Sequence, residues 1–154
     1  MNKVYIAGPF FNDKQLTVIK IIEEELRQGG IRFFSPRSAG VLKQLGTEER
    51  AKQIPAIYKR NIDEIFTCHV MIAVVDGRDE GTMFEIGYAT CLKDTRGSRK
   101  IITISAEGHG LNIMLRESVD AHLNRFSDVE PCVVSAFDDR LSAGEFMADR
   151  GEAW

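Results

Sequence analysis

Residues 70–89 read VMIAVVDGRDEGTMFEIGYA, and the change of pattern within this stretch decides the fold. The first six residues are apolar and largely β-branched, which is typical of a strand buried on both faces of a parallel sheet. A short acidic loop follows, and then a helical pattern begins. Ligands of open α/β sheets bind at the carboxyl ends of the strands. We therefore expect Asp79, in the loop, and Glu85, in the first turn of the next helix, to lie at a site of chemistry.

Both carboxylates also have an ordinary structural interpretation. Residues 82–85 fit the capping-box pattern, in which Thr82 caps the helix and Glu85 reaches back to the N–H of that cap. Asp79, taken alone, fits a solvated loop aspartate. In the functional interpretation, the positive potential of the helix N-terminus keeps Glu85 ionised and ready to act as a nucleophile.

Length and composition indicate one domain spanning residues 1–154. The chain has 154 residues, 44% of them hydrophobic, which suffices for one sizeable core. Its 20 basic and 23 acidic residues are interspersed, so no basic stripe for nucleic acid and no polybasic segment for a membrane is present. Apolar runs are too short to span a membrane and no signal-type segment opens the chain, so we expect a cytoplasmic protein.

Cysteine and histidine positions predict neither disulfides nor metal. The three cysteines are odd in number, widely spaced and set in or beside apolar sequence, as buried free thiols are. They are Cys68, Cys91 and Cys132. The three histidines share no metal-ligand spacing with them, and we expect no metal and no cofactor. They are His69, His109 and His122.

Strand and helix patterns alternate along the chain. The predicted strands cover residues 3–7, 31–34, 70–75 and 100–105, and residues 132–134 form either a weak fifth strand or a packed extension. Helical spacing of apolar residues marks residues 16–26, 54–65, 82 onward and 111–118. Residues 35–49 have no clear period and fit a long loop or a poorly marked short helix, which we expect to border the site. This order predicts an α/β fold, a single-domain doubly wound parallel sheet of about five strands, flavodoxin-like or Rossmann-like, with helices on both faces.

Four separate stretches carry a resemblance to a known family. They are residues 5–11, YIAGPFF; residues 79–89, DEGTMFEIGYA; residues 111–114, LNIM; and residues 151–154, GEAW. Through them the chain resembles the nucleoside 2-deoxyribosyltransferases over most of its length. The resemblance implies that Glu85 is the catalytic nucleophile, that Asp79 is an acid/base, and that Gly81 lies at the substrate.

The same resemblance assigns further residues to substrate. Gly8, Phe10 and Phe11 belong to the loop that packs around the nucleobase, although core packing is the alternative for both aromatic residues. Asn112 would hold the 5′-hydroxyl of the sugar in a neighbouring subunit's site, while an ordinary helix cap is its alternative. Met114 would enter the same neighbouring site.

Two positions of the resemblance concern the base and the chain end. Where family members commonly carry a base-contacting aspartate, this chain has Asn61, with Asp63 two residues on; an asparagine can bind a base but cannot shuttle a proton. The alternative for Asp63 is a solvent-facing position on a helix. The carboxylate of Trp154 would also reach a site, so the resemblance implies a homo-oligomer with shared sites.

The implied reaction is transfer of a 2-deoxyribosyl group between nucleobases. Glu85 would attack the anomeric carbon to give a covalent deoxyribosyl-enzyme, and Asp79 would protonate the departing base. A second base then attacks the same carbon, so two displacements give net retention. Tyr5 would orient Glu85 through its hydroxyl. The partners are deoxynucleosides and free nucleobases.

Two other functions stay open. One is hydrolysis of the N-glycosidic bond of a 2′-deoxynucleoside 5′-monophosphate, which requires donors for phosphate. The first loop, residues 8–13, has neither Ser nor Arg, but residues 35–38, SPRS, offer such donors. The other is a nucleotide-sensing module that performs no chemistry.

Overall fold

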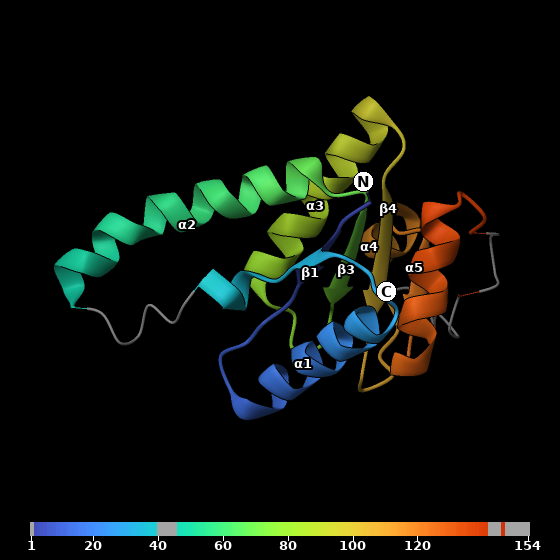
Figure 1. Ribbon diagram of the computed structural model, residues 1–154, viewed down its shortest axis with the longest axis horizontal. Helices are drawn as coiled ribbons and strands as arrows, with labels where there is room; N and C mark the ends of the chain where they lie inside the picture. Colours follow the sequence, from blue (N-terminus) through green and yellow to red (C-terminus); the bar gives the residue numbers. More distant parts are fainter. Residues whose placement is uncertain (1, 40–45, 142–145, 147–154) are drawn as a thin grey trace.

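The computed structural model describes residues 2–39, 46–141 and 146, and its five strands form one parallel sheet in the order β2-β1-β3-β4-β5 (Figure 1). The strands are β1 (Val4–Ala7), β2 (Phe33–Phe34), β3 (Val70–Val74), β4 (Lys100–Ile104) and β5 (Ala121–Leu123). Every neighbouring pair is parallel. The predicted fold class is therefore confirmed.

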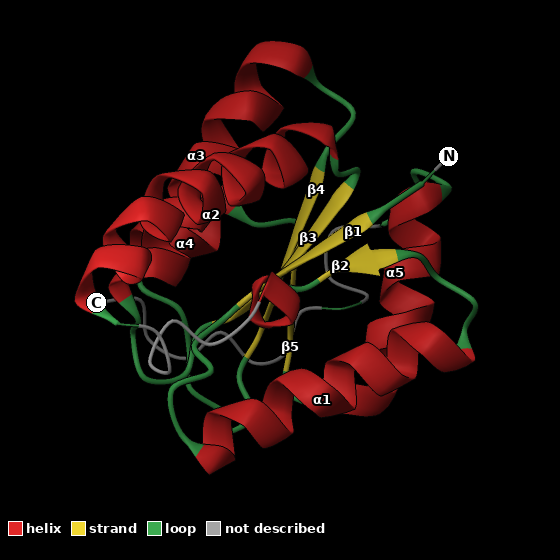
Figure 2. Cartoon of the chain, turned by 60° about the vertical axis from the view of Figure 1, so that its left-hand side comes forward, coloured by secondary structure: helices red, strands yellow, loops and turns green. Residues whose placement is uncertain are grey.

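Helices cover both faces of this sheet. They are α1 (Asp13–Gln28), α2 (Thr47–Thr67), α3 (Glu80–Arg96), α4 (Ile113–Ser118) and α5 (Val129–Phe137), with 3-10 turns at Pro36–Ala39 and Phe126–Asp128. Figure 2 shows α1 and α5 together on one side of the strands, and α2, α3 and α4 on the other. None of the described helices is long and apolar enough to cross a membrane.

The core consists of two layers separated by the sheet, and β3 contributes to both. Ile72 and Val74 pack on one face with Ile22 of α1. Met71 packs on the other face with Ile86 of α3. Every residue of β3 is buried, which explains why its sequence is an uninterrupted apolar run rather than an alternating one.

The fifth strand is not where the sequence indicated. Residues 132–134 lie in α5, whose buried residues recur at intervals of three and four, so of the two alternatives the weak fifth strand is wrong. The true edge strand, β5, is three residues long and has a histidine at its centre. His122 is buried because its Nδ1 lies 2.9 Å from the hydroxyl of Thr103 on β4. A histidine at the centre of a three-residue strand leaves no apolar run from which the sequence could predict β5.

Two smaller expectations also change. Cys91 is exposed, so it is not the buried thiol that its apolar neighbours suggested, whereas Cys68 and Cys132 are buried and all three are free. Of the expected long loop at residues 35–49, residues 36–39 form a 3-10 turn and α2 already begins at Thr47, while residues 40–45 lie outside the described part.

The winding direction reverses between β1 and β3, which places a crevice at the carboxyl ends of these two strands. Gly8 follows β1 directly at this point. A Cβ on Gly8 would lie 2.8 Å from Cδ1 of Ile19 and 3.1 Å from Cβ of Val74. Only a glycine therefore lets the chain pass this close to α1 and β3 as it leaves the sheet.

Candidate active site

A hydrogen bond between β1 and α3 forms the centre of the candidate site. Tyr5 is fully buried on β1, and its hydroxyl donates to Oε1 of Glu85 at 2.6 Å, across 80 residues of sequence. Glu85 is half-buried. Its second oxygen, Oε2, forms no hydrogen bond with the described residues, yet it is not among their buried, unpartnered polar atoms. One oxygen is thus fixed by Tyr5, and the other stays accessible.

Burial controls the ionisation of this pair. Desolvation raises the pKa of Glu85 from 4.5 to about 7; the hydrogen bond from Tyr5 opposes the rise, and the negative charge of Asp79 adds to it. Burial and the nearby charge of Glu85 raise the pKa of Tyr5. Tyr5 therefore stays a protonated donor, whereas Glu85 changes its charge near neutral pH, as catalytic carboxyl groups often do.

Asp79, not Thr82, caps helix α3. Oδ2 of Asp79 accepts hydrogen bonds from the backbone N–H and the hydroxyl of Thr82, both at 2.8 Å, and the helix begins at Glu80. The predicted capping box is therefore wrong, and Glu85 lies in the second turn rather than the first. Aspartate is as good a cap as threonine and comes earlier in the chain, so the helix starts there.

The cap also holds Asp79 still beside Glu85. Its Oδ1 forms no hydrogen bond with the described residues, so this oxygen is available to a ligand. Gly81 keeps the space next to the cap open, because a Cβ there would lie 3.2 Å from Oδ2 of Asp79. Asp79 is thus not the solvated loop residue of the ordinary interpretation.

The two candidate residues of α2 point in different directions. Asp63 is exposed and forms an ion pair with Lys59 one helical turn earlier, which matches the solvent-facing alternative. The side-chain oxygen of Asn61 is buried and has no hydrogen-bond partner in the described part of the chain. A buried acceptor without a donor is unfavourable, so Asn61 is a position where a ligand N–H would be stabilising.

The aromatic loop after β1 forms a stacked pair. The rings of Phe10 and Phe11 lie 5.3 Å apart between centroids, at an interplanar angle of 28°. Phe10 is half-buried and Phe11 is 58% exposed, so core packing does not account for Phe11.

Asn112 and Met114 lie at the other side of α3, where α4 begins. Asn112 caps α4 by accepting a hydrogen bond from the backbone N–H of Leu115 at 3.0 Å, so the ordinary role weighed for it is present. Met114 is 76% exposed on the first turn of α4. Trp154 lies outside the described residues.

The described part of the chain includes two cavities at the carboxyl edge of the sheet, and neither of these is lined by Glu85. The larger, of about 870 Å³, has walls from the loops after β3 and β4, including Arg78, His109 and Asn112. The smaller, of about 200 Å³, lies against the start of α1, beside Asn12 and Lys14. Glu85 bonds to Tyr5 of β1 and does not line the larger cavity, although Met83 of the same helix does.

Comparison with known proteins identifies the family. The family model described as nucleoside 2-deoxyribosyltransferase matches residues 4–114, which include Tyr5, Asp79 and Glu85. The chain belongs to the nucleoside 2-deoxyribosyltransferase family. The members of this family are enzymes that act on nucleosides, and the sequence resemblance is thereby confirmed.

Several known proteins are similar to this family member. The 2-deoxyribosyltransferase of the psychrotolerant bacterium Bacillus psychrosaccharolyticus is 28% identical, with a TM-score of 0.69 over 83% of this chain and 90% of the other. A CMP N-glycosidase of Clostridium botulinum shares the fold, at 18% identity and a TM-score of 0.50 over 86% of this chain and 98% of the other. An uncharacterized protein of Ureaplasma parvum serovar 3 is 31% identical over 114 residues, 68% of this chain and 70% of its own.

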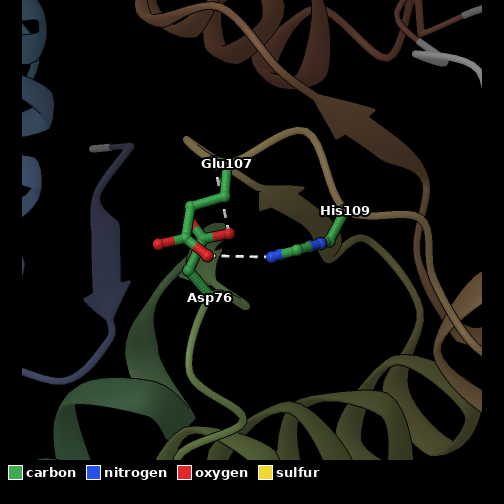
Figure 3. A group of neighbouring side chains, drawn as sticks. All are labelled: Asp76, Glu107 and His109. Carbon is green, nitrogen blue, oxygen red and sulfur yellow. Dashed lines mark hydrogen bonds and ion pairs between the residues drawn. The ribbon is translucent and has the colours of Figure 1, made fainter.

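Sequence reasoning missed one polar cluster of this family member. Asp76, Glu107 and His109 come from the loops after β3 and β4, and their side-chain ligand atoms lie within 4.8 Å of one another (Figure 3). Asp76 accepts hydrogen bonds from the Ser105 hydroxyl and the Ala106 N–H, both at 2.6 Å.

Internal bonds account for this arrangement. Glu107 pairs with His109 at 2.8 Å and with Lys14 of α1, and the hydrogen bond from Lys14 contributes most to lowering the pKa of Glu107. The bonds that Asp76 accepts therefore join the loop after β3 to the loop after β4, and we call Asp76, Glu107 and His109 the loop latch. Its signal was present in the sequence, because polar residues directly after neighbouring parallel strands meet at one edge.

Proposed function

We propose that this protein transfers a 2-deoxyribosyl group between nucleobases by double displacement, with Glu85 as the nucleophile. The observation that carries the proposal is the geometry of the Glu85 carboxyl group, with Oε1 held by Tyr5 and Oε2 accessible. A nucleophile fixed at one oxygen can approach a sugar in one defined orientation.

The first step forms a bond between Oε2 of Glu85 and the anomeric carbon. The N-glycosidic bond breaks, its electron pair leaves with the base, and Asp79 supplies the proton that the base takes up. In the second step a different base attacks the same carbon and gives its proton to Asp79, and the Glu85 carboxylate is released. Because each displacement inverts the carbon, the configuration is retained overall.

The base and sugar would be held by residues around this centre. The free oxygen of Asn61 accepts an N–H of the base, and the stacked pair of Phe10 and Phe11 offers aromatic faces to its ring. Asn112 lines the larger cavity, which Glu85 of the same chain does not line, and Met114 is exposed on the first turn of α4. We therefore propose that they act in the site of a second copy, which makes the active form a homo-oligomer.

Donors for a 5′-phosphate are engaged elsewhere in the described structure. The guanidinium of Arg37 donates through Nε to Oε1 of Glu23 at 2.6 Å and through its terminal nitrogen to the other oxygen. The hydroxyl of Ser38 donates to the carbonyl of Ser35. These contacts favour a nucleoside over its monophosphate as the substrate.

The test offers the protein three substrates in parallel: a deoxynucleoside with a different free base, the deoxynucleoside alone, and the deoxynucleoside 5′-monophosphate. We expect a new nucleoside in the first reaction, slow release of base in the second, and little release of sugar phosphate in the third. Glu85→Gln should abolish all three and the covalent deoxyribosyl adduct seen by intact-protein mass spectrometry. Rapid formation of sugar phosphate would establish the hydrolase instead, and binding without turnover would establish a sensing module.

A further inference from the structure

Tyr5, whose hydroxyl binds Glu85, belongs to a stack of side chains with Phe34 and Arg60, which we call the aromatic column. Tyr5 of β1 and Phe34 of β2 are register partners, and their rings stack at 5.7 Å between centroids with an interplanar angle of 26°. On the outer side of Phe34, the guanidinium carbon of Arg60 from α2 lies 5.0 Å from the ring centroid. The order from the protein surface inward is thus the guanidinium of Arg60, the ring of Phe34, the ring of Tyr5 and the carboxyl group of Glu85.

Because β2 is the edge strand beside β1, Phe34 is the neighbour of Tyr5 on the edge side of the sheet. On its other side Tyr5 is in register with Met71 of β3, which is fully buried within the same core layer. β2 is an edge strand of two residues, so no further strand supports Tyr5 beyond Phe34. Arg60, which is itself exposed, lies over the ring of buried Phe34 and forms no hydrogen bond or ion pair with the described residues, so the ring is its partner there.

We propose that Phe34 and Arg60 are positioning residues of the reaction, which act through Tyr5 by fixing its ring so that its hydroxyl stays on Glu85. The inference rests on the proposed function, in which Glu85 attacks the sugar. Neither residue would touch the reacting atoms. A stacked ring restricts Tyr5 to one plane, and the cation above Phe34 keeps that ring from tilting outward.

Loss of the column has a defined electrostatic consequence. The groups that act on Glu85 are the Tyr5 hydroxyl, which lowers its pKa, and Asp79, which raises it together with burial. Around Tyr5, the titratable groups are Glu85, Cys68 and Glu64; the carboxylates of Glu85 and Glu64 raise the pKa of Tyr5, whereas burial raises the pKa of the Cys68 thiol and keeps it neutral. If the Tyr5 hydroxyl moves away, burial and the charge of Asp79 remain, and both raise the pKa of Glu85. The nucleophile then ionises at higher pH.

The experiment measures kcat/KM for base exchange as a function of pH in the full chain. Phe34→Leu should shift the acid limb of this profile to higher pH by about half a unit, and it should therefore lower kcat/KM below neutral pH several-fold. Phe34→Tyr, which keeps the ring, should restore the wild-type profile. Arg60→Met removes only the surface cation and should give a smaller shift in the same direction, so the test does not depend on whether Phe34→Leu folds.

A double-mutant cycle decides whether the effect passes through Tyr5. In a Tyr5→Phe background, Phe34→Leu should leave the acid limb unchanged, because the hydroxyl is already gone. A further shift of the same size would overturn the inference, as would an unchanged limb in both single variants. Phe66→Leu is the control: the exposed ring of Phe66 carries Arg96 at 4.1 Å, is not stacked on Tyr5 or Phe34, and its loss should not move the profile.

A second readout separates this inference from the proposed function. The ionisation of Glu85 can be followed by NMR of carboxyl-labelled glutamate, without any turnover. If the wild type exchanges no bases, the proposed function fails. The NMR titration of Phe34→Leu against wild type still shows whether the column sets the ionisation of Glu85, and an unchanged titration would refute it.

Discussion

Replacement of Glu85 by Gln should stabilise the folded protein at alkaline pH. The folded state holds this carboxyl with a pKa of about 7, above its ordinary value of 4.5, chiefly because burial disfavours the charge. Between these values the native state binds more protons than the unfolded state, so the free energy of unfolding falls as pH rises through this window and levels off above it. Glutamine is uncharged at every pH and does not incur this loss.

The magnitude follows from the same shift. A rise from 4.5 to about 7 corresponds to about 3 kcal/mol of destabilisation once the carboxyl is ionised. Because Glu85 is only half-buried, water screens part of this, and we expect a gain of about 1–3 kcal/mol at about pH 8. The side-chain oxygen of Gln can still accept the hydrogen bond from Tyr5, so the substitution removes the charge and keeps the contact.

Urea unfolding of both proteins, followed by circular dichroism, measures the difference. The variant should unfold at higher urea than the wild type at about pH 8, and the gain should shrink to a few tenths of a kcal/mol at about pH 4.5. Glu80→Gln, the same change at an exposed position in the first turn of the same helix, should give no gain at alkaline pH. A Glu85→Gln protein that is equally or less stable at about pH 8 would refute the account of an ionised, desolvated nucleophile.

Three further outcomes follow from the site. Asp76→Asn should lower the free energy of unfolding by about 1–2 kcal/mol in urea titrations, since the charged acceptor of the loop latch is lost; an unchanged midpoint would contradict the latch. Asn61→Asp replaces an amide by an acceptor-only group, so kcat/KM should shift about tenfold toward bases that present amino groups over bases that present carbonyls. Mixed oligomers of Asn112→Ala and Glu85→Ala should regain exchange activity that neither variant has alone, and no recovery would show that each subunit is self-contained.

The central strands could be predicted from sequence because they are uninterrupted apolar runs. β1, β3 and β4 begin and end within a residue of their expected positions. Residues 132–134 misled because three apolar residues fit a strand and a helix equally well, and only the spacing over all nine residues of α5 reveals the helical face. β5 could not be seen, because the bond that permits buried His122 comes from Thr103 on another strand.

Some features of the candidate site could likewise be predicted from local sequence, and others depend on the fold. Asp79 and Glu85 were singled out because local sequence identifies the strand end and the helix that follows it, and Tyr5 was singled out through the family resemblance. The choice of cap was not decided by sequence, since Asp79 and Thr82 both suit the position and only the structure shows which begins the helix. The Phe34 stack and the Arg60 contact depend on strand order and on the path of α2, which no local pattern reports.

A buried tyrosine in a central strand supports our proposal that the Tyr5–Glu85 pair serves chemistry. An apolar residue at position 5 would need no partner, whereas a buried hydroxyl requires one, and the partner here is a carboxyl group that burial disfavours in its charged form. Well-packed apolar residues often replace such pairs without loss of stability. The pair is nevertheless placed in a core layer that is mostly apolar, at the crevice beside β1 and β3. Under the proposed function, this local cost is offset by an oriented carboxylate whose charge changes near neutral pH.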